Sequence, residues 1–317
     1  MDRTNNPYHD EKVFWPYHME KSLTILRGSI PAPSLVEIDP TDAACNQMCP
    51  HCCFSSSPYR KMVLLNVEAL LRFVAETYEC GTYAYELVGG GEPTNHPQIA
   101  DIVRGINSLG KPSVERPHIG MVTNGVLLHR IFSVAEHLDF VRVSLDTSDP
   151  ANYSLLHGIS LRSNDFFRVV GNVKDMISII GGARVRIGYL VVPPHNHQRK
   201  MVLDAAEFAY NLGVGHIVFR PAFLDYVIER EMWREAAEAV LEAKNKYRND
   251  FVLGGVGGSW EHALGRQDHP GGLCRTRPLV LVVKADGTIP SCFLYRERLA
   301  ERPVIGHISQ GFKTVWF

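Results

Sequence analysis

The sequence predicts an α/β fold built on a parallel sheet, and three observations lead to this prediction. Short runs rich in β-branched residues alternate with longer amphipathic stretches, as in repeated strand–helix units. Glycines follow several of these stretches, where a helix is expected to end: Gly81, Gly110 and Gly213. Polar motifs follow the strands, and ligands of parallel α/β folds bind at the carboxyl ends of strands.

Six strands and six helices are expected. The strands cover residues 35–39, 84–88, 118–123, 140–145, 184–191 and 216–219. The helices cover residues 67–78, 98–109, 127–136, 165–179, 198–211 and 231–247. Around residues 251–269 the periodicity gives way to glycine-rich sequence, which predicts a boundary. We therefore expect an N-terminal segment (1–34), a main domain (35–250) and a small C-terminal extension (251–317).

Composition excludes several classes of protein. Apolar residues make up 45% and charged residues 21% of the 317, as in ordinary globular proteins. The formal net charge is −1 with no basic block, which disfavours nucleic acid as a partner. The sequence has no apolar run long enough to span a membrane and no signal-peptide core near its start. Seven cysteines then indicate reduced thiols or metal ligands in a cytoplasmic protein.

Cys45, Cys49 and Cys52 form a Cys-x3-Cys-x2-Cys run, with His51 directly before the last cysteine. Four thiolates would complete the ligands of a [4Fe–4S] cluster, whereas three leave one iron for a small molecule. The alternative is a zinc site, which needs four ligands and would take His51 or Cys53 as the fourth.

This spacing, together with the run Gly89–Pro93 after the second expected strand, resembles the signature of the radical S-adenosylmethionine (SAM) enzymes. The resemblance implies a partial (β/α)6 TIM-like barrel and a [4Fe–4S] cluster on the three cysteines. SAM would chelate the open iron through its amino and carboxylate groups. One electron, from an external donor such as flavodoxin or ferredoxin, would cleave it to methionine and a 5′-deoxyadenosyl radical.

The resemblance also implies a SAM pocket at the strand ends. Glycines let a backbone approach a ligand closely, and the family receives the SAM amino group at this motif. The pocket residues expected before the fourth strand are His51, Gly89, Gly90, Gly91, Glu92 and Asn124.

The fourth strand places Arg142, Ser144 and Asp146 on one face by alternation. The resemblance assigns this face to the ribose hydroxyls and carboxylate of SAM, and an internal salt bridge of Arg142 with Asp146 or Glu92 is the alternative. Arg220, after the sixth strand, contacts SAM or substrate or pairs with a structural carboxylate. Cys53 lines the SAM loop, and these two residues are the catalytic candidates.

Two further segments contain histidines or cysteines outside these motifs. The run 193–197, with two histidines, is expected to be a solvated loop because a metal site needs more ligands. Near the C-terminus, Cys274 and Cys292 flank an apolar strand (279–283) and an Asp-Gly hairpin turn (285–288). This resembles the twitch or SPASM extensions, which hold an auxiliary [4Fe–4S] cluster. Further cysteines are absent downstream, so the chain is truncated, other ligands complete the cluster, or the hairpin is vestigial.

The expected substrate is a small polar molecule of the sugar or aminocyclitol type, which undergoes dehydrogenation or epimerisation. The N-terminal segment is short for a peptide-recognition domain, which favours this class over peptide maturation, the second enzymatic hypothesis. A non-catalytic metal-binding module is the alternative of another class. It has no need for a SAM pocket, so the motifs at residues 89–93 and 142–146 argue against it.

Overall fold

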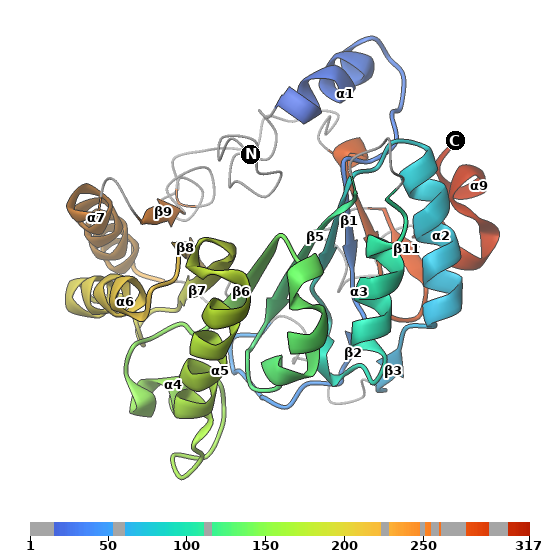
Figure 1. Cartoon of the computed structure of the whole chain (residues 1–317). Coiled ribbons are helices and arrows are strands. Elements are labelled where there is room, and N and C mark those ends of the chain that lie inside the picture. Colours follow the sequence, from blue (N-terminus) through green and yellow to red (C-terminus); the bar gives the residue numbers. More distant parts are fainter. Residues whose placement is uncertain are drawn as a thin grey trace.

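The computed structural model describes residues 16–52, 61–110, 116–222, 228–247, 251–254, 260, 277–291 and 304–317. Its centre is an eight-stranded sheet in the order β10-β1-β4-β5-β6-β7-β8-β9, and every neighbouring pair in it is parallel. Helices cover one face of this sheet (Figure 1). The predicted α/β partial-barrel class is confirmed.

The strands of the sheet are β1 (Leu35–Ile38), β4 (Ala84–Leu87), β5 (His118–Thr123), β6 (Phe140–Ser144), β7 (Val185–Val191), β8 (His216–Pro221), β9 (Val252–Gly254) and β10 (Val280–Val283). The helices are α1 (Pro16–Leu26), α2 (Val67–Glu79), α3 (Ile99–Asn107), α4 (Pro150–Leu156), α5 (Asp165–Ile180), α6 (Arg199–Leu212), α7 (Arg230–Lys246) and α9 (Phe312–Trp316). Short 3₁₀ helices include η2 (Pro93–Asn95), η3 (Leu128–His137), η4 (Gly182–Arg184), η5 (Arg277–Leu279) and η8 (Ile308–Gln310).

The two faces of the sheet differ in chemistry because side chains alternate along each strand. Apolar side chains such as Ile38, Leu87 and Ile187 are buried in one core with the helices. Charged side chains occupy the alternate positions and so lie on the opposite face, which also carries the small apolar cluster of Leu35, Ala84 and Phe140. These charged residues are Glu37, Glu86, Arg142, Arg186 and Arg220, and His216 lies on the same face. The open face of the partial barrel is therefore polar along its middle.

Each of the six expected strands is present, and the sheet gains two more. The apolar run at residues 279–283 does form a strand, but β10 pairs in parallel with β1, with Leu35 opposite Val280. The expected turn follows it, because Lys284 N donates to Thr288 O (2.9 Å) and Gly287 has φ +84°. The next strand, β11 (Thr288–Pro290), pairs antiparallel with β12 (Val304–His307) as a separate two-stranded sheet. A small antiparallel sheet near the C-terminus is thus confirmed.

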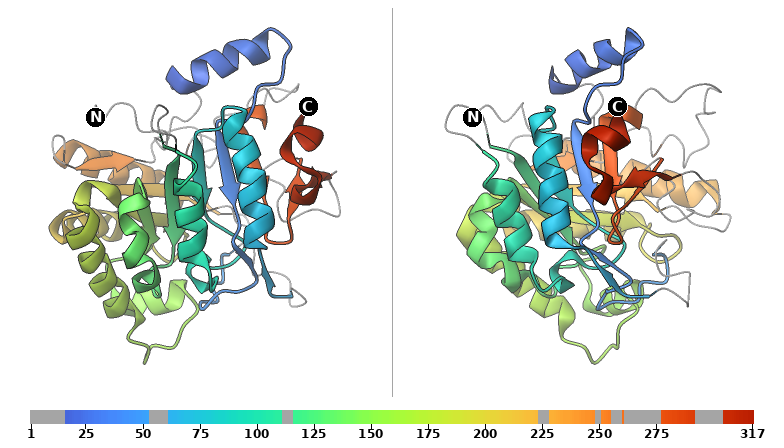
Figure 2. Two further views of the ribbon diagram at one scale, coloured as in Figure 1. Left: turned by 45° about the vertical axis from the view of Figure 1, so that its right-hand side comes forward. Right: turned by 90° about the vertical axis from the view of Figure 1, so that its right-hand side faces the viewer.

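The C-terminal segment packs on the helical layer next to α2, as both views in Figure 2 show. Glu76 on α2 accepts a hydrogen bond from Phe312 N at 2.6 Å. The ring of Phe312 meets Phe73 edge-on at 5.8 Å, and Trp316 Nε1 donates to Pro31 O at 2.8 Å. These contacts link the last residues to the start of the barrel. Among the described helices, none is both long and apolar enough to cross a membrane.

Candidate active site

The segment that leads into Cys45 is bound to the turn that follows β4. Thr41 and Asp42 form β2, which pairs with β3 (Val63–Leu64), and Asp42 also bridges Gly90. Ala43 N donates to Gly90 O at 3.2 Å, and Glu92 N donates to Ala44 O at 2.9 Å. The glycine motif therefore fixes where the cysteine loop begins.

The glycine at position 91 is needed for this close approach. A Cβ there would lie 2.6 Å from Thr41 Oγ1 and 2.8 Å from Ala44 O, both too short for real contacts. The backbone of the motif thus lies directly against the residue before Cys45. Glycine is therefore required at position 91 by the packing of the chain itself, independently of any ligand.

Glu92 ties the end of β4 to the end of β5. Its buried carboxylate accepts hydrogen bonds from Thr94 N (3.0 Å), Thr94 Oγ1 (2.6 Å), Thr123 Oγ1 (2.6 Å) and Asn124 N (2.7 Å). Burial raises the pKa of Glu92, while these four donors act in the opposite direction. Both oxygens are thus used within the protein, which makes Glu92 a link between strand ends.

Asn124, after β5, reaches the first part of the cysteine loop. Its Nδ2 donates to Asn46 Oδ1 at 2.7 Å and lies 3.9 Å from Cys45 Sγ. Its Oδ1 accepts from Val126 N at 3.1 Å, which fixes the side chain. Burial, followed by the charges of Glu92 and Cys52, raises the pKa of the Cys45 thiol. A cationic iron bound to the sulfur would act in the opposite direction.

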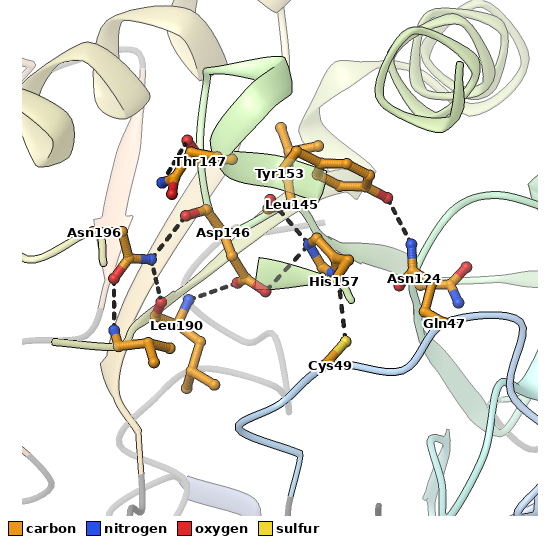
Figure 3. A network of polar contacts seen from close by, with 12 residues as sticks. Gln47, Cys49, Asn124, Leu145, Asp146, Thr147, Tyr153, His157, Leu190 and Asn196 are labelled. Atoms are coloured by element: carbon orange, nitrogen blue, oxygen red, sulfur yellow. Dashed lines mark hydrogen bonds and ion pairs between the residues drawn. The ribbon is translucent and has the colours of Figure 1, made fainter. Parts of the chain in front are cut away.

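The end of β6 reaches Cys49 through a buried histidine (Figure 3). His157 follows α4, and its Nδ1 lies 3.5 Å from Cys49 Sγ. Its Nε2 lies 3.3 Å from Leu145 O and 3.6 Å from Asp146 Oδ2. Burial lowers the pKa of His157 to about 4 and raises that of Asp146 to about 7. Cys49, His157 and Asp146 form a continuous polar chain from the loop to the sheet.

Backbone contacts hold the loop against the same region. Met48 N donates to His157 O at 3.1 Å, and Gln47 Nε2 donates to Tyr153 OH at 2.8 Å. Gly158 has φ +59°, and a Cβ on it would lie 2.0 Å from Met48 O. Only glycine fits there, so the α4 turn and the cysteine loop are in direct backbone contact.

Asp146 is itself held by β7 and the loop after it. Its φ is +61°, which is rare for a residue with a side chain, and Oδ1 accepts from Leu190 N at 2.7 Å. Asn196 Nδ2 donates to Asp146 O at 2.9 Å and to Leu190 O at 2.8 Å. Pro193, Asn196 and His197 are buried, so the expectation of a solvated loop at 193–197 is wrong for these three residues, whereas Pro194 and His195 are exposed.

The remaining predicted residues lie as follows. Arg142 does not pair with Asp146 or Glu92 as the alternative held; its Nη2 lies 3.6 Å from Glu86 Oε1 across the sheet. Alternation places Ser144 on the face of Arg142 but does not extend to Asp146, because β6 ends at Ser144 and the backbone turns. Arg220, on β8, lies opposite Leu190.

His51 is partly buried in the cysteine loop, where burial and His195 lower its pKa to about 4. Cys53, Cys274 and Cys292 lie outside the described residues.

The donor set fits a cluster in its chemistry. Three thiols come from one loop, which is held by the turns after β4 and α4 and by the Asn124 side chain after β5. Within the loop, Cys52 N donates to Cys49 O at 3.1 Å. Within the described part of the chain, no three His, Cys, Asp or Glu side chains gather around one point as a single metal ion would need. In a cubane each thiolate binds a different iron, so the sulfurs need not converge in that way.

Sequence reasoning missed His157, Tyr153, Gln47 and Asn196, which carry much of the geometry around Cys49. The glycine after His157 was a usable signal, because a glycine often marks a turn or a close backbone contact. The contact of His157 with Cys49 joins residues 108 positions apart, and sequence alone does not give it.

Comparison with known proteins agrees with this geometry. A family model described as "Radical SAM superfamily" matches residues 42–218, more than half of the chain. A probable GTP 3′,8-cyclase of Saccharolobus islandicus (strain Y.N.15.51 / Yellowstone #2) is 28% identical over 176 residues, which are 55% of this chain and 52% of that protein. GTP 3′,8-cyclase of Chlorobaculum tepidum is 27% identical over 202 residues, 63% and 58% of the two chains. The chain spans about half the length of the curated relatives it matches.

Solved structures show the same fold. Streptococcus suis SuiB bound to S-adenosylmethionine aligns with a TM-score of 0.71 at 14% identity, covering 94% of this chain and 69% of SuiB. Native anSMEcpe with bound AdoMet aligns with a TM-score of 0.66 at 16% identity, covering 90% and 80%. From the family match, which includes the cysteine loop and the strands around it, the chain belongs to the radical SAM superfamily, whose members use a [4Fe–4S] cluster and SAM.

Proposed function

We propose that this chain is an enzyme in which Cys45, Cys49 and Cys52 hold a [4Fe–4S] cluster and the ends of β4, β5 and β6 bind SAM beside it. One observation carries the proposal: the residues after these three strands, Gly90, Asn124 and Asp146, all reach the cysteine loop, Asp146 through His157. Membership of the radical SAM superfamily, a family of enzymes, also favours catalysis over a non-catalytic metal-binding module.

The residues of the chain have distinct tasks in this proposal. When bound, the cluster and SAM supply a 5′-deoxyadenosyl radical that abstracts a hydrogen atom from the substrate. Gly89–Gly91 offer backbone without side chains to the SAM amino group. Glu92 keeps this backbone in register with Asn124 through its contacts with Thr123 and Asn124. Arg142 and Ser144 lie on the open face of β6, where a ribose or a carboxylate can meet them.

We propose a small polar substrate, bound on the open face of the barrel. This face carries charged groups beside its small apolar cluster: Arg142 lies beside Glu86, and the guanidinium of Arg186 lies 4.2 Å from the Phe140 ring centroid. Ionic side chains at such positions are costly to bury unless polar groups meet them. The curated relatives named GTP 3′,8-cyclase take a molecule that contains a sugar and phosphates, which supports this class.

Peptide maturation stays the second hypothesis. SuiB has also been solved bound to its precursor peptide SuiA and aligns with a TM-score of 0.69, but at 14% identity this likeness concerns the fold. The charged open face favours the small polar molecule, with dehydrogenation or epimerisation as the reaction.

The test is anaerobic reconstitution with iron and sulfide, followed by incubation with SAM and either dithionite or reduced flavodoxin. The wild-type protein should take up about four irons for the site cluster and release 5′-deoxyadenosine. The triple variant Cys45→Ala/Cys49→Ala/Cys52→Ala should do neither. Production of 5′-deoxyadenosine by the triple variant would end the cluster assignment.

The substrate class has its own experiment. Wild-type enzyme is incubated with sugars, aminocyclitols, nucleotides and short peptides, and each mixture is analysed by mass. Loss of two daltons indicates dehydrogenation, and uptake of one solvent deuterium indicates epimerisation. Turnover of peptides with none of the small molecules would replace our proposal with peptide maturation.

We also propose that Cys274 and Cys292, outside the described residues, are ligands of an auxiliary cluster or its remnant. If they are ligands, wild-type protein should hold more than the roughly four irons of one cubane, and the Cys274→Ala/Cys292→Ala variant only about four. If the wild type and this variant hold equal amounts of iron, the two cysteines are only the remnant of a cluster site.

A further inference from the structure

We propose that His157 is a positioning residue for the cluster, which holds the Cys49 sulfur through Nδ1 and thereby raises the reduction potential of the cluster. The inference rests on the proposed cluster site. It adds a residue far from the cysteine loop in sequence that is not part of the cysteine motif.

The imidazole ring of His157 is fixed on every side. Its Nδ1 lies 3.5 Å from Cys49 Sγ, and the residue is only 1% exposed. Nε2 faces Leu145 O at 3.3 Å and Asp146 Oδ2 at 3.6 Å. The ring also packs on Tyr153, with centroids 4.1 Å apart and planes tilted by 38°. A ring held in this way cannot turn away from the sulfur.

The backbone around His157 fixes the loop as well as the ring. Met48, the residue directly before Cys49, donates its backbone N–H to His157 O at 3.1 Å. The next residue, Gly158, has no Cβ and allows this approach. The contact between Nδ1 and the sulfur is therefore part of a built junction between the end of β6 and the cysteine loop (Figure 3).

The polar groups behind the ring determine what Nδ1 can do. Nδ1 can donate to a thiolate when His157 and Asp146 together carry two hydrogens, one on Nδ1 and the other between Nε2 and Asp146 Oδ2. Asp146 is fixed for this by Leu190 N, which donates to its Oδ1 at 2.7 Å. Groups that orient a metal ligand from behind commonly tune the metal.

The chemical consequence concerns electron transfer. A hydrogen bond to a cluster sulfur stabilises the reduced form, which carries more negative charge, and so raises the reduction potential. Asn124 Nδ2 is 3.9 Å from Cys45 Sγ, a longer contact than that of His157 with Cys49. We therefore expect Cys49 to be the thiolate through which the protein sets the potential.

Three substitutions separate this role from packing. In His157→Asn the side-chain amide reaches the position of Nδ1 and keeps a donor for the sulfur. In His157→Gln it reaches the position of Nε2 and keeps the contact with Leu145 and Asp146. His157→Phe keeps a ring against Tyr153 but loses both polar contacts.

The measurement is the midpoint potential of the reconstituted cluster, from a redox titration monitored by EPR. His157→Gln and His157→Phe should shift the one-electron reduction equilibrium about tenfold toward the oxidised cluster, which corresponds to a fall of about 59 mV. His157→Asn should stay within about twofold of the wild type, well under that 59 mV step. In protein labelled with ¹⁵N-histidine, pulsed EPR should detect a nitrogen coupling that His157→Phe abolishes.

Equal potentials in all four proteins, or an equal fall in all three variants, would overturn the proposal. Loss of iron from His157→Gln and His157→Phe but not from His157→Asn would support it, because His157→Asn alone among the three variants keeps a donor at the position of Nδ1. Equal iron loss from all three would contradict it. If the wild type cleaves SAM and the variants have the same midpoint potential as the wild type, only the role of His157 is refuted. If the wild type assembles no cluster, the proposed site itself is refuted.

Discussion

Glu92 and Asp146 are buried carboxylates that join the ends of neighbouring strands. Glu92 connects β4 to β5 through Thr123 and Asn124. Asp146 connects β6 to β7 through Leu190 N. Each therefore acts on the folded state, and this effect can be measured in protein without metal.

Glu92→Ala should destabilise the metal-free protein. The substitution leaves Thr94, Thr123 and Asn124 donors buried without their acceptor, at a cost of about 1–3 kcal/mol for such a group. Urea denaturation should show this loss of unfolding free energy. Glu68→Ala is the matched control, because Glu68 is 81% exposed in a surface pair with Arg72 and should change stability by less than about 1 kcal/mol. Equal effects of the two substitutions would disprove the structural role of Glu92.

Asp146→Asn should remove a pH dependence of stability. Burial raises the folded-state pKa of Asp146 to about 7, from the 3.8 that is ordinary for an aspartate. Between these values the folded protein binds a proton that the unfolded chain does not, so its stability rises as the pH falls from 7 toward 4. The slope is about 1.4 kcal/mol per pH unit.

The measurement for Asp146 compares unfolding free energies of metal-free wild type and Asp146→Asn at pH 8 and pH 5. The wild type should gain on the order of 2–3 kcal/mol relative to the variant at the lower pH. A difference that stays constant with pH would show that Asp146 titrates normally. Asparagine can still accept the hydrogen bond from Leu190 N, so the comparison isolates the charge.

Among elements, the turn after α4 controls the cysteine loop. Gly158→Ala would place a Cβ 2.0 Å from Met48 O at a φ of +59°, so the loop must shift. We expect the variant to keep its helix content by circular dichroism but to bind much less iron. Gly171→Ala, on α5 with nothing near the added Cβ, should load iron normally and be as stable as the wild type or more so. Normal iron loading by Gly158→Ala would contradict the role of this turn.

At this scale the sequence predicted the elements well and their contacts partly. The six strand–helix units follow from periodicity and glycine punctuation, because every unit buries an apolar face against its neighbours. The same periodicity predicts the strand at 84–88 and so places the motif at residues 89–93 directly after β4. Two things stayed hidden: β10 pairs with β1 across more than 240 residues, and Asp146 turns out of the strand alternation through its positive φ. Both depend on tertiary packing, which local pattern does not encode.

At the scale of the whole molecule, the last described residues are part of the barrel. β10 extends the sheet beyond β1, and α9 packs on α2 through Phe312, whose side chain is fully buried. Glu76 accepts from the backbone N–H of the same residue. The first and last parts of the described chain thus meet at this edge of the sheet, where Trp316 also reaches Pro31.

Phe312→Ala should therefore lower the stability of the entire barrel. Loss of a buried phenylalanine costs about 3–5 kcal/mol, a large part of the total stability of about 5–15 kcal/mol of a typical domain. The urea midpoint followed by circular dichroism, which reports mainly on the barrel helices, should fall accordingly. Phe317→Ala is the control in the same segment, because Phe317 is 71% exposed and should change stability by less than about 1 kcal/mol. If the two variants unfold at the same urea concentration, the C-terminal segment contributes nothing to the barrel, and the junction at Phe312, Phe73 and Glu76 does not stabilise the fold.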